Sequence, residues 1–174
     1  MKKALIMSDT HGMVKEVARL VELAKPDHVF HCGDFCVNER NMPFKQMILV
    51  RGNNDTQANV PYDRTFEWMG LRIFMTHGHR YRVNQTLLNL MYKAKEEEAD
   101  VVLFGHTHHP VCLEQDGLII VNPGSLKSPR GFPVPTVVLW KIEELEKGLE
   151  LSFTFYDALK RKAISSLSRT FQIK

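Results

Sequence analysis

The fold of this chain is first indicated by the stretch Ala4-Leu5-Ile6-Met7-Ser8-Asp9-Thr10-His11-Gly12. Its short apolar run predicts a buried strand, and the polar residues that follow predict a loop. From Val14 to Ala24 the apolar residues recur mostly at helical spacing, until Pro26 ends the pattern. A strand, a loop and a helix in this order are typical of a parallel α/β sheet, in which ligands bind beyond the carboxyl ends of the strands.

The same arrangement recurs along the chain, where each apolar strand pattern is followed by a short polar motif. The strand patterns and their motifs are residues 28–32 with Gly33-Asp34, 47–50 with Gly52-Asn53-Asn54-Asp55, 71–75 with Thr76-His77-Gly78-His79, and 101–104 with Gly105-His106-Thr107-His108. The third strand is the second arm of a hairpin predicted over 66–75, which turns at Gly70. Each motif falls near the carboxyl end of its strand, so we expect the motifs to share one crevice.

The remaining sequence predicts one more helix and several antiparallel strands. The helix covers about 85–98, a hairpin over 111–114 and 118–121 turns at Asp116-Gly117, and further strands cover 136–140 and 149–155. The first half of the chain is therefore α/β in pattern, and the second half is mostly antiparallel. We predict an α/β fold built as a two-sheet β-sandwich flanked by helices.

Length and composition favour a single domain with no membrane span. The 174 residues suffice for one well-buried core. No run approaches the roughly eighteen apolar residues of a spanning helix, and the start of the chain is too short in apolar residues for a signal peptide. The three cysteines are an odd number, which favours a reducing cytoplasm and buried structural roles for Cys32 and Cys36.

The formal net charge of +3 comes from the end of the chain. Residues 158–174 carry five Lys or Arg residues and no acid, so the rest of the chain has a charge of −2. We therefore expect a globular domain over 1–157 and a basic C-terminal extension over 158–174. Ile164, Leu167 and Phe171 recur at helical spacing, which predicts a helix packed on the body or on a second subunit, with a solvated tail as the alternative.

The five motifs carry side chains that bind metals. Carboxylates, an amide oxygen and imidazoles, with no cysteine in the pattern, favour Mn²⁺, Fe²⁺, Ni²⁺ or Zn²⁺. Two such ions, about 3.5–4 Å apart, can activate a water and clamp a phosphoryl group. Taken alone, each motif also fits a helix cap, a turn or a hydrogen-bonded core histidine. Five of them at strand ends favour a binuclear metal site.

The order and spacing of the motifs resemble the calcineurin-like metallophosphoesterase family over residues 3 to about 157. The short length and Asn122-Pro123-Gly124-Ser125 resemble its small bacterial and archaeal phosphodiesterase branch. The resemblance implies two divalent transition-metal ions, with Mn²⁺ as first choice and Ni²⁺, Fe²⁺ or Zn²⁺ as alternatives. It implies that one metal is held by Asp9, His11 and His108 and the other by Asn53, His77 and His106, with Asp34 bridging both.

The third motif departs from the family pattern at Asn54, where many members have a histidine that assists the leaving group or the phosphate oxygens. An amide can donate a hydrogen bond to a phosphate oxygen but supplies no proton. We therefore expect Asn54 to contact the substrate, and His79 to serve as the acid or as a hydrogen-bonding group. Asn122 and Ser125 are candidate substrate contacts, with a turn as the alternative reading.

These expectations describe a cytoplasmic, metal-dependent phosphodiesterase, in which a metal-bridging hydroxide attacks a small phosphodiester. The alternative is a non-catalytic or weakly catalytic scaffold or regulatory protein of the same fold. All seven ligand positions hold competent side chains, which favours catalysis. Membrane binding is not expected, whereas a homo-oligomer stays open and only the basic tail supports a nucleic-acid partner. Three arginines near the motifs are candidate phosphate contacts, with a surface role as the default: Arg51, Arg80 and Arg82.

Overall fold

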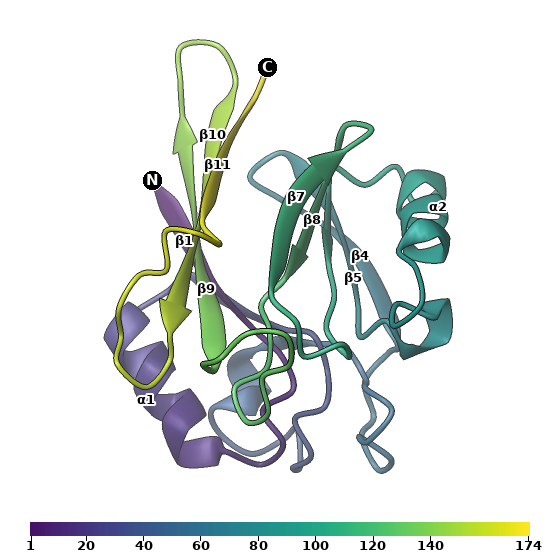
Figure 1. Cartoon of the computed structure of the whole chain (residues 1–174), viewed down its shortest axis with the longest axis vertical. Helices are drawn as coiled ribbons and strands as arrows, with labels where there is room; N and C mark the ends of the chain where they lie inside the picture. Colours follow the sequence, from purple (N-terminus) through teal and green to yellow (C-terminus); the bar gives the residue numbers. More distant parts are fainter.

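Two β-sheets face each other, and a helix packs on the outer face of each (Figure 1). The structure is a computed structural model that describes residues 1–174. It confirms the predicted two-sheet sandwich with flanking helices.

The first sheet has six strands in the order β11-β10-β9-β1-β2-β3. Its strands are β1 (Lys2–Met7), β2 (His28–His31), β3 (Ile48–Leu49), β9 (Thr136–Glu144), β10 (Leu149–Asp157) and β11 (Arg169–Ile173). β1, β2 and β3 run parallel, and the other three strands continue the sheet in antiparallel pairs. The first three motifs therefore leave this sheet at the same edge.

The second sheet has five strands in the order β4-β5-β6-β8-β7. Its strands are β4 (Asp63–Trp68), β5 (Leu71–Thr76), β6 (Val101–Leu103), β7 (Val111–Gln115) and β8 (Leu118–Asn122). The pairs β4–β5 and β7–β8 are the two predicted hairpins, while β5, β6 and β8 run parallel to one another. The two histidine motifs leave this sheet at the carboxyl ends of β5 and β6.

Strand β1 is buried on both faces because it lies between the second sheet and a helix. Ala4 and Ile6 belong to the core between the sheets, whereas Leu5 and Met7 pack in the cluster that includes helix α1 (Val14–Ala24). This explains why its apolar run shows no polar alternation, as is usual for parallel strands covered on both sides. Helix α2 (Leu88–Glu96) packs in the same way on the second sheet.

Helix α2 is shorter than the predicted 85–98. Residues before it form turns, in which Arg82 O accepts hydrogen bonds from Gln85 N and Thr86 N. Thr86 Oγ1 then accepts a hydrogen bond from Leu88 N, so the hydroxyl marks the start of the helix. At the other end, Glu98 has a φ of 55°, which is incompatible with a continuing helix. Neither helix has the length and hydropathy that a membrane crossing requires.

The helix predicted over 158–174 is wrong, because Arg169–Ile173 form strand β11. The strand pairs with β10, and the Phe171 ring lies 6.0 Å from that of Phe153. Backbone pairing with the edge of β10 and the contact with Phe153 therefore favour a strand here, despite the helical spacing of the three apolar side chains. Ile164 and Leu167 still pack against the core between the sheets.

Candidate metal centre

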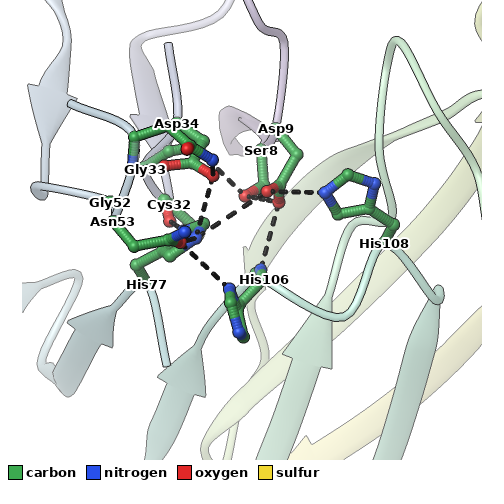
Figure 2. Close-up of polar contacts among 12 residues, drawn as sticks. Ser8, Asp9, Cys32, Gly33, Asp34, Gly52, Asn53, His77, His106 and His108 are labelled. Atoms are coloured by element: carbon green, nitrogen blue, oxygen red, sulfur yellow. Dashed lines mark hydrogen bonds and ion pairs between the residues drawn. The ribbon is translucent and has the colours of Figure 1, made fainter. Parts of the chain in front are cut away.

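The predicted ligands come together at one edge of the sandwich, from loops of both sheets (Figure 2). Asp9 follows β1, Asp34 follows β2, Asn53 follows β3, His77 follows β5, and His106 and His108 follow β6. His77 and His79 both lie beyond the end of β5 rather than within it, and His79 starts a 3₁₀ turn, η2 (His79–Tyr81).

Two groups of candidate ligands share the carboxylate of Asp9. In the first, Asp9 Oδ1 lies 3.1 Å from His108 Nε2 and 3.8 Å from His11 Nε2. In the second, the same oxygen lies 3.8 Å from His77 Nε2. Asp34 Oδ2 faces both groups, at 3.4 Å from His77 Nε2 and 3.9 Å from His11 Nε2. The ligand atoms of each group lie within 4.8 Å of one another, which suits a shared ion.

Lone pairs converge in this cluster without donors to match them. Asp9 Oδ1 and His11 Nε2 are buried and have no hydrogen-bond partner. His77 Nδ1 lies 2.7 Å from Cys32 O, and because a carbonyl only accepts, Nδ1 must donate. A neutral His77 therefore presents a lone pair at Nε2, which faces Asn53 Oδ1 at 3.0 Å. Buried acceptors that face one another are costly unless a cation lies between them, so these residues fit a metal of the nitrogen and oxygen class.

A second backbone carbonyl orients His108. Its Nδ1 donates to Ser128 O at 2.7 Å, which leaves Nε2 directed at Asp9. A hydrogen bond of this kind fixes the tautomer and the ring orientation of a metal-binding histidine. The Cys32 carbonyl does the same for His77.

Asn53 links the two histidines predicted to share its metal. Its Oδ1 lies 3.0 Å from His77 Nε2 and 3.1 Å from His106 Nδ1. The structure therefore brings together all seven residues predicted as ligands, although their roles as ligands stay a prediction.

Mutual charge interactions favour ionised carboxylates in the cluster. Burial raises the pKa of Asp9, but the neighbouring His108 and His77 rings outweigh burial, so the pKa is lowered. Burial likewise raises the pKa of Asp34, and contacts with His77 and Asn54 bring it below its usual value. The close contact with Asp9 raises the pKa of His108. Protons and divalent cations thus compete for the same atoms, as expected of a metal site.

The backbone is strained at the candidate ligands. Five of them have φ angles in the left-handed region: Asp9 (52°), His11 (42°), Asp34 (56°), His106 (67°) and His108 (60°). Such conformations cost of order 1–3 kcal/mol each in residues other than glycine and gather at functional sites. No sequence pattern predicts these left-handed conformations, since aspartate and histidine also occupy ordinary ones.

Two motif glycines make room for the carboxylates, a role that the sequence analysis missed. A Cβ on Gly52 would overlap Asp34 Oδ1 and lie 2.8 Å from Asp34 Cγ. A Cβ on Gly105 would overlap Ser8 Oγ and lie 2.8 Å from Asp9 Oδ2. The presence of a glycine in each motif was the only sequence signal of this role. The side chain that contacts each glycine comes from a loop distant in sequence, so the contact itself could not be predicted.

The Asn54 side chain lies on Asp34, which places it differently from the predicted substrate contact. Its Nδ2 donates to Asp34 Oδ2 and its backbone N donates to Asp34 Oδ1, both at 2.8 Å. Asp55 has a structural role, because its carboxylate accepts backbone hydrogen bonds from Gly52, Asp34 and Cys36. These two residues therefore hold the second and third motifs in register with each other.

His79 lies beside the cluster without joining it. Its ring centroid is 5.4 Å from that of His77 and 6.0 Å from that of His106, and its Nδ1 is buried without a partner. Burial, followed by the neighbouring histidines, lowers the pKa of His79 to about 4. A ring with this pKa is neutral at pH 7, so it suits the predicted hydrogen-bonding role better than that of an imidazolium acid.

Asn122 and Ser125 hydrogen bond to neighbouring loops. Both are fully buried. Asn122 Nδ2 donates to Gly105 O, while Ser125 Oγ donates to Asp9 O and accepts from two backbone N–H groups. The predicted substrate role is therefore unsupported by their positions, and both residues brace the loops of Asp9 and Gly105.

His31 and the cysteines complete the surroundings of the site. Gly33 N donates to His31 Nδ1 at 3.1 Å, so the other ring nitrogen carries the proton and donates to Thr10 Oγ1 at 2.9 Å. Burial lowers the pKa of His31 to about 3, which keeps the ring neutral. Cys32 is buried, as predicted, whereas the prediction of a buried Cys36 is wrong, because Cys36 lies in an exposed loop with its Sγ 3.5 Å from His11 Nδ1.

This arrangement belongs to a known class of phosphoesterases. The model of the calcineurin-like phosphoesterase superfamily domain matches residues 1–145, so the chain is a member of that family. The family is metal-dependent, and the two groups around Asp9 give this chain its candidate metal-binding residues.

Individual relatives agree with this assignment. The chain is 35% identical over 128 residues to the probable metallophosphoesterase YsnB of Bacillus subtilis, which covers 72% of this chain and 76% of that protein. It is 31% identical over 140 residues to phosphodiesterase MJ0936 of Methanocaldococcus jannaschii, with 68% and 81% covered.

Solved structures share the fold over the whole chain. A Streptococcus pneumoniae protein described as a predicted phosphoesterase superimposes with a TM-score of 0.88 at 28% identity, covering 99% of this chain and 98% of that one. Vacuolar protein sorting 29 of Cryptosporidium parvum superimposes with a TM-score of 0.76 at 18% identity, covering 99% and 98%. At that identity the second likeness concerns the fold alone.

Proposed function

We propose that this protein is a phosphodiesterase that depends on two divalent transition-metal ions. The observation that carries the proposal is the sharing of Asp9 by two ligand groups, with Asp34 facing both. The relative MJ0936 of Methanocaldococcus jannaschii is named a phosphodiesterase. Two bound ions would supply Lewis acidity toward a phosphoryl oxygen and an activated water for its hydrolysis.

The protein side chains would contribute position and charge. Asp9, His11 and His108 would hold one ion, and Asn53, His77 and His106 the other, with Asp34 between them. Asn54 would fix the Asp34 carboxylate through two hydrogen bonds, since both carboxylate oxygens accept from it. Mn²⁺ is our first choice of metal, because carboxylate and amide oxygens form much of the ligand set.

The uncharged groups beside the cluster favour a diester over a monoester. A monoester carries nearly two negative charges at pH 7, and an alkyl monoester also needs a proton for its leaving group. Asn54 supplies neither charge nor proton, and His79 is neutral at pH 7 because its pKa is lowered to about 4. A groove of about 480 Å³ that begins at Asn54 and Cys36 offers space for one ester substituent.

The experiment compares metal-loaded protein, chelated protein and the variant Asp34→Asn, with bis(4-nitrophenyl) phosphate as substrate. We expect up to two ions per chain and loss of turnover on chelation, with recovery when Mn²⁺ is added back. Asp34→Asn should lower activity more than any single histidine change, because it removes the charge that both ions share. Asp116→Asn, at an exposed hairpin turn, is the matched control and should behave as wild type. Full activity in metal-stripped protein would refute the proposal.

A scaffold or regulatory protein is the second candidate, because the fold is shared with vacuolar protein sorting 29, whose name describes a sorting role. In that case the protein would bind metal at these residues yet turn over no phosphodiester. The same experiment separates the two candidates, since metal content and turnover are measured on one sample.

A further inference from the structure

Tyr62 lies beside the metal centre with two arginine side chains over its ring. Arg80 Cζ is 4.8 Å and Arg51 Cζ is 5.2 Å from the ring centroid. The Tyr62 centroid is 5.7 Å from that of His79, which is 5.4 Å from that of the candidate ligand His77. A single imidazole therefore separates this aromatic ring from the metal cluster.

The two arginines differ in what they bind. Arg51 donates to Asp55 O at 3.0 Å and to Thr56 O at 2.8 Å, so its guanidinium is committed to the loop of the third motif. Arg80 is exposed and has no hydrogen bond or ion pair to the protein. The acid next to Tyr62, Asp63, accepts hydrogen bonds from two hydroxyl groups on other elements. The charge of Arg80 is therefore free for a ligand.

Stacking on an aromatic ring prepares a guanidinium for anion binding. The ring fixes the plane of the guanidinium, and its N–H groups stay available at the edges of that plane. Phosphate matches this edge with two parallel hydrogen bonds. Tyr62 is 37% exposed and Arg80 is exposed, so the pair is open to solvent.

We propose that Arg80, held over Tyr62, binds a second phosphate group of the substrate. The substrate class would then be diesters in which one ester substituent carries an additional phosphate. This inference rests on the proposed function and deepens it, because it makes Arg80 a specificity-determining residue. A short oligonucleotide and a nucleotide ester with a second phosphate share this chemistry.

The kinetic test uses a matched pair of substrates, thymidine 5′-(4-nitrophenyl phosphate) and the same ester with a 3′-phosphate. We expect wild type to prefer the second by about tenfold in kcat/KM. This value lies between the small effect of an exposed ion pair and the larger effect of a bidentate phosphate contact. Arg80→Ala should reduce this preference to near one, and Arg80→Lys should keep part of it. Arg19→Ala, which removes an exposed arginine of α1 with no aromatic partner, is the control and should keep it in full.

A binding measurement makes the test independent of turnover. Calorimetry compares thymidine 3′,5′-bisphosphate with thymidine 5′-monophosphate on metal-loaded protein, and the bisphosphate should bind more tightly only when Arg80 is present. The inference is overturned if wild type shows no preference, if Arg80→Ala keeps it, or if Arg80→Ala weakens both ligands equally, as a loop-stabilising residue would. Selective bisphosphate binding without turnover of either ester would refute the proposed function and leave the Arg80 site standing.

Discussion

Replacing Gly52 by alanine tests whether the Asp34 carboxylate must keep its position. The added Cβ would overlap Asp34 Oδ1 and lie 2.8 Å from Asp34 Cγ. The Cβ would also overlap the Asp34 backbone N, so the loop that carries the carboxylate would have to move with it. Because carbon atoms in contact prefer a separation of about 3.5–4.0 Å, the carboxylate would move by roughly 0.7 Å or more. Metal-ligand distances tolerate only about ±0.2 Å, which means that Asp34 could no longer face both groups. Figure 2 shows Gly52 beside Asp34 in this cluster.

We expect Gly52→Ala to lose metal and to lower kcat/KM by about 10²-fold, the effect of misplacing a catalytic group by roughly 1 Å. The φ of Gly52 is not positive, so backbone strain does not contribute. The matched control is Gly117→Ala, where φ is 78° and the new Cβ would meet nothing within 4 Å. That variant should lose thermal stability through strain while keeping its metal and its turnover.

The assay combines elemental analysis of dialysed protein, turnover of bis(4-nitrophenyl) phosphate and thermal melting followed by circular dichroism. A folded Gly52→Ala protein with the metal content and activity of wild type would show that the clash is relieved without moving the carboxylate. In that case Asp34 would not be the residue on which the two groups depend.

Three further outcomes are expected. Asn54→His should raise the monoester-to-diester ratio of kcat/KM for matched aryl esters, with metal content intact, because an imidazole supplies a proton donor; an unchanged ratio would contradict this. The pKa of His31 is lowered from 6.5 to about 3, so the unfolded state binds more protons between these values. As the pH is lowered below about 6.5, the free energy of unfolding should therefore decrease by up to roughly 1.4 kcal/mol per pH unit. Denaturant titrations at several pH values should show a weaker pH dependence for His31→Gln. Truncation after Asp157 should lower the melting temperature and leave metal content unchanged, because β11 lies away from the cluster; loss of metal would contradict it.

The parts of the fold that sequence predicted best are those with local causes. Strand β1 and helix α1 appear where their apolar patterns predict them, and the turns at Gly70 and Asp116-Gly117 join the predicted hairpins. The prediction for the residues of β11 was wrong because their conformation depends on pairing with the edge of β10, and the sequence alone does not show this pairing. Three side chains at helical spacing could not reveal that edge.

The candidate site divides in the same way. The motifs at strand ends predicted one shared crevice, and the family resemblance implied which seven side chains would meet there. The orientation of each group was not predictable, because it depends on contacts from other loops. Asn54 was expected to reach a substrate but hydrogen bonds to Asp34, and Ser125 braces the backbone of Asp9.

The geometry of the site bears on the choice between catalysis and a purely structural metal. Structural metal sites are closed by protein ligands, whereas catalytic sites keep a position open for water or substrate. Here Asp9 and His77 close the inner side of the cluster, both fully buried, whereas Asn53 is exposed and the His11 side chain is 22% exposed on the outer side. A closed structural site would need neither strained ligands nor a side that faces solvent, and this cluster has both. This open side, next to the free charge of Arg80, is where a phosphodiester would reach both groups.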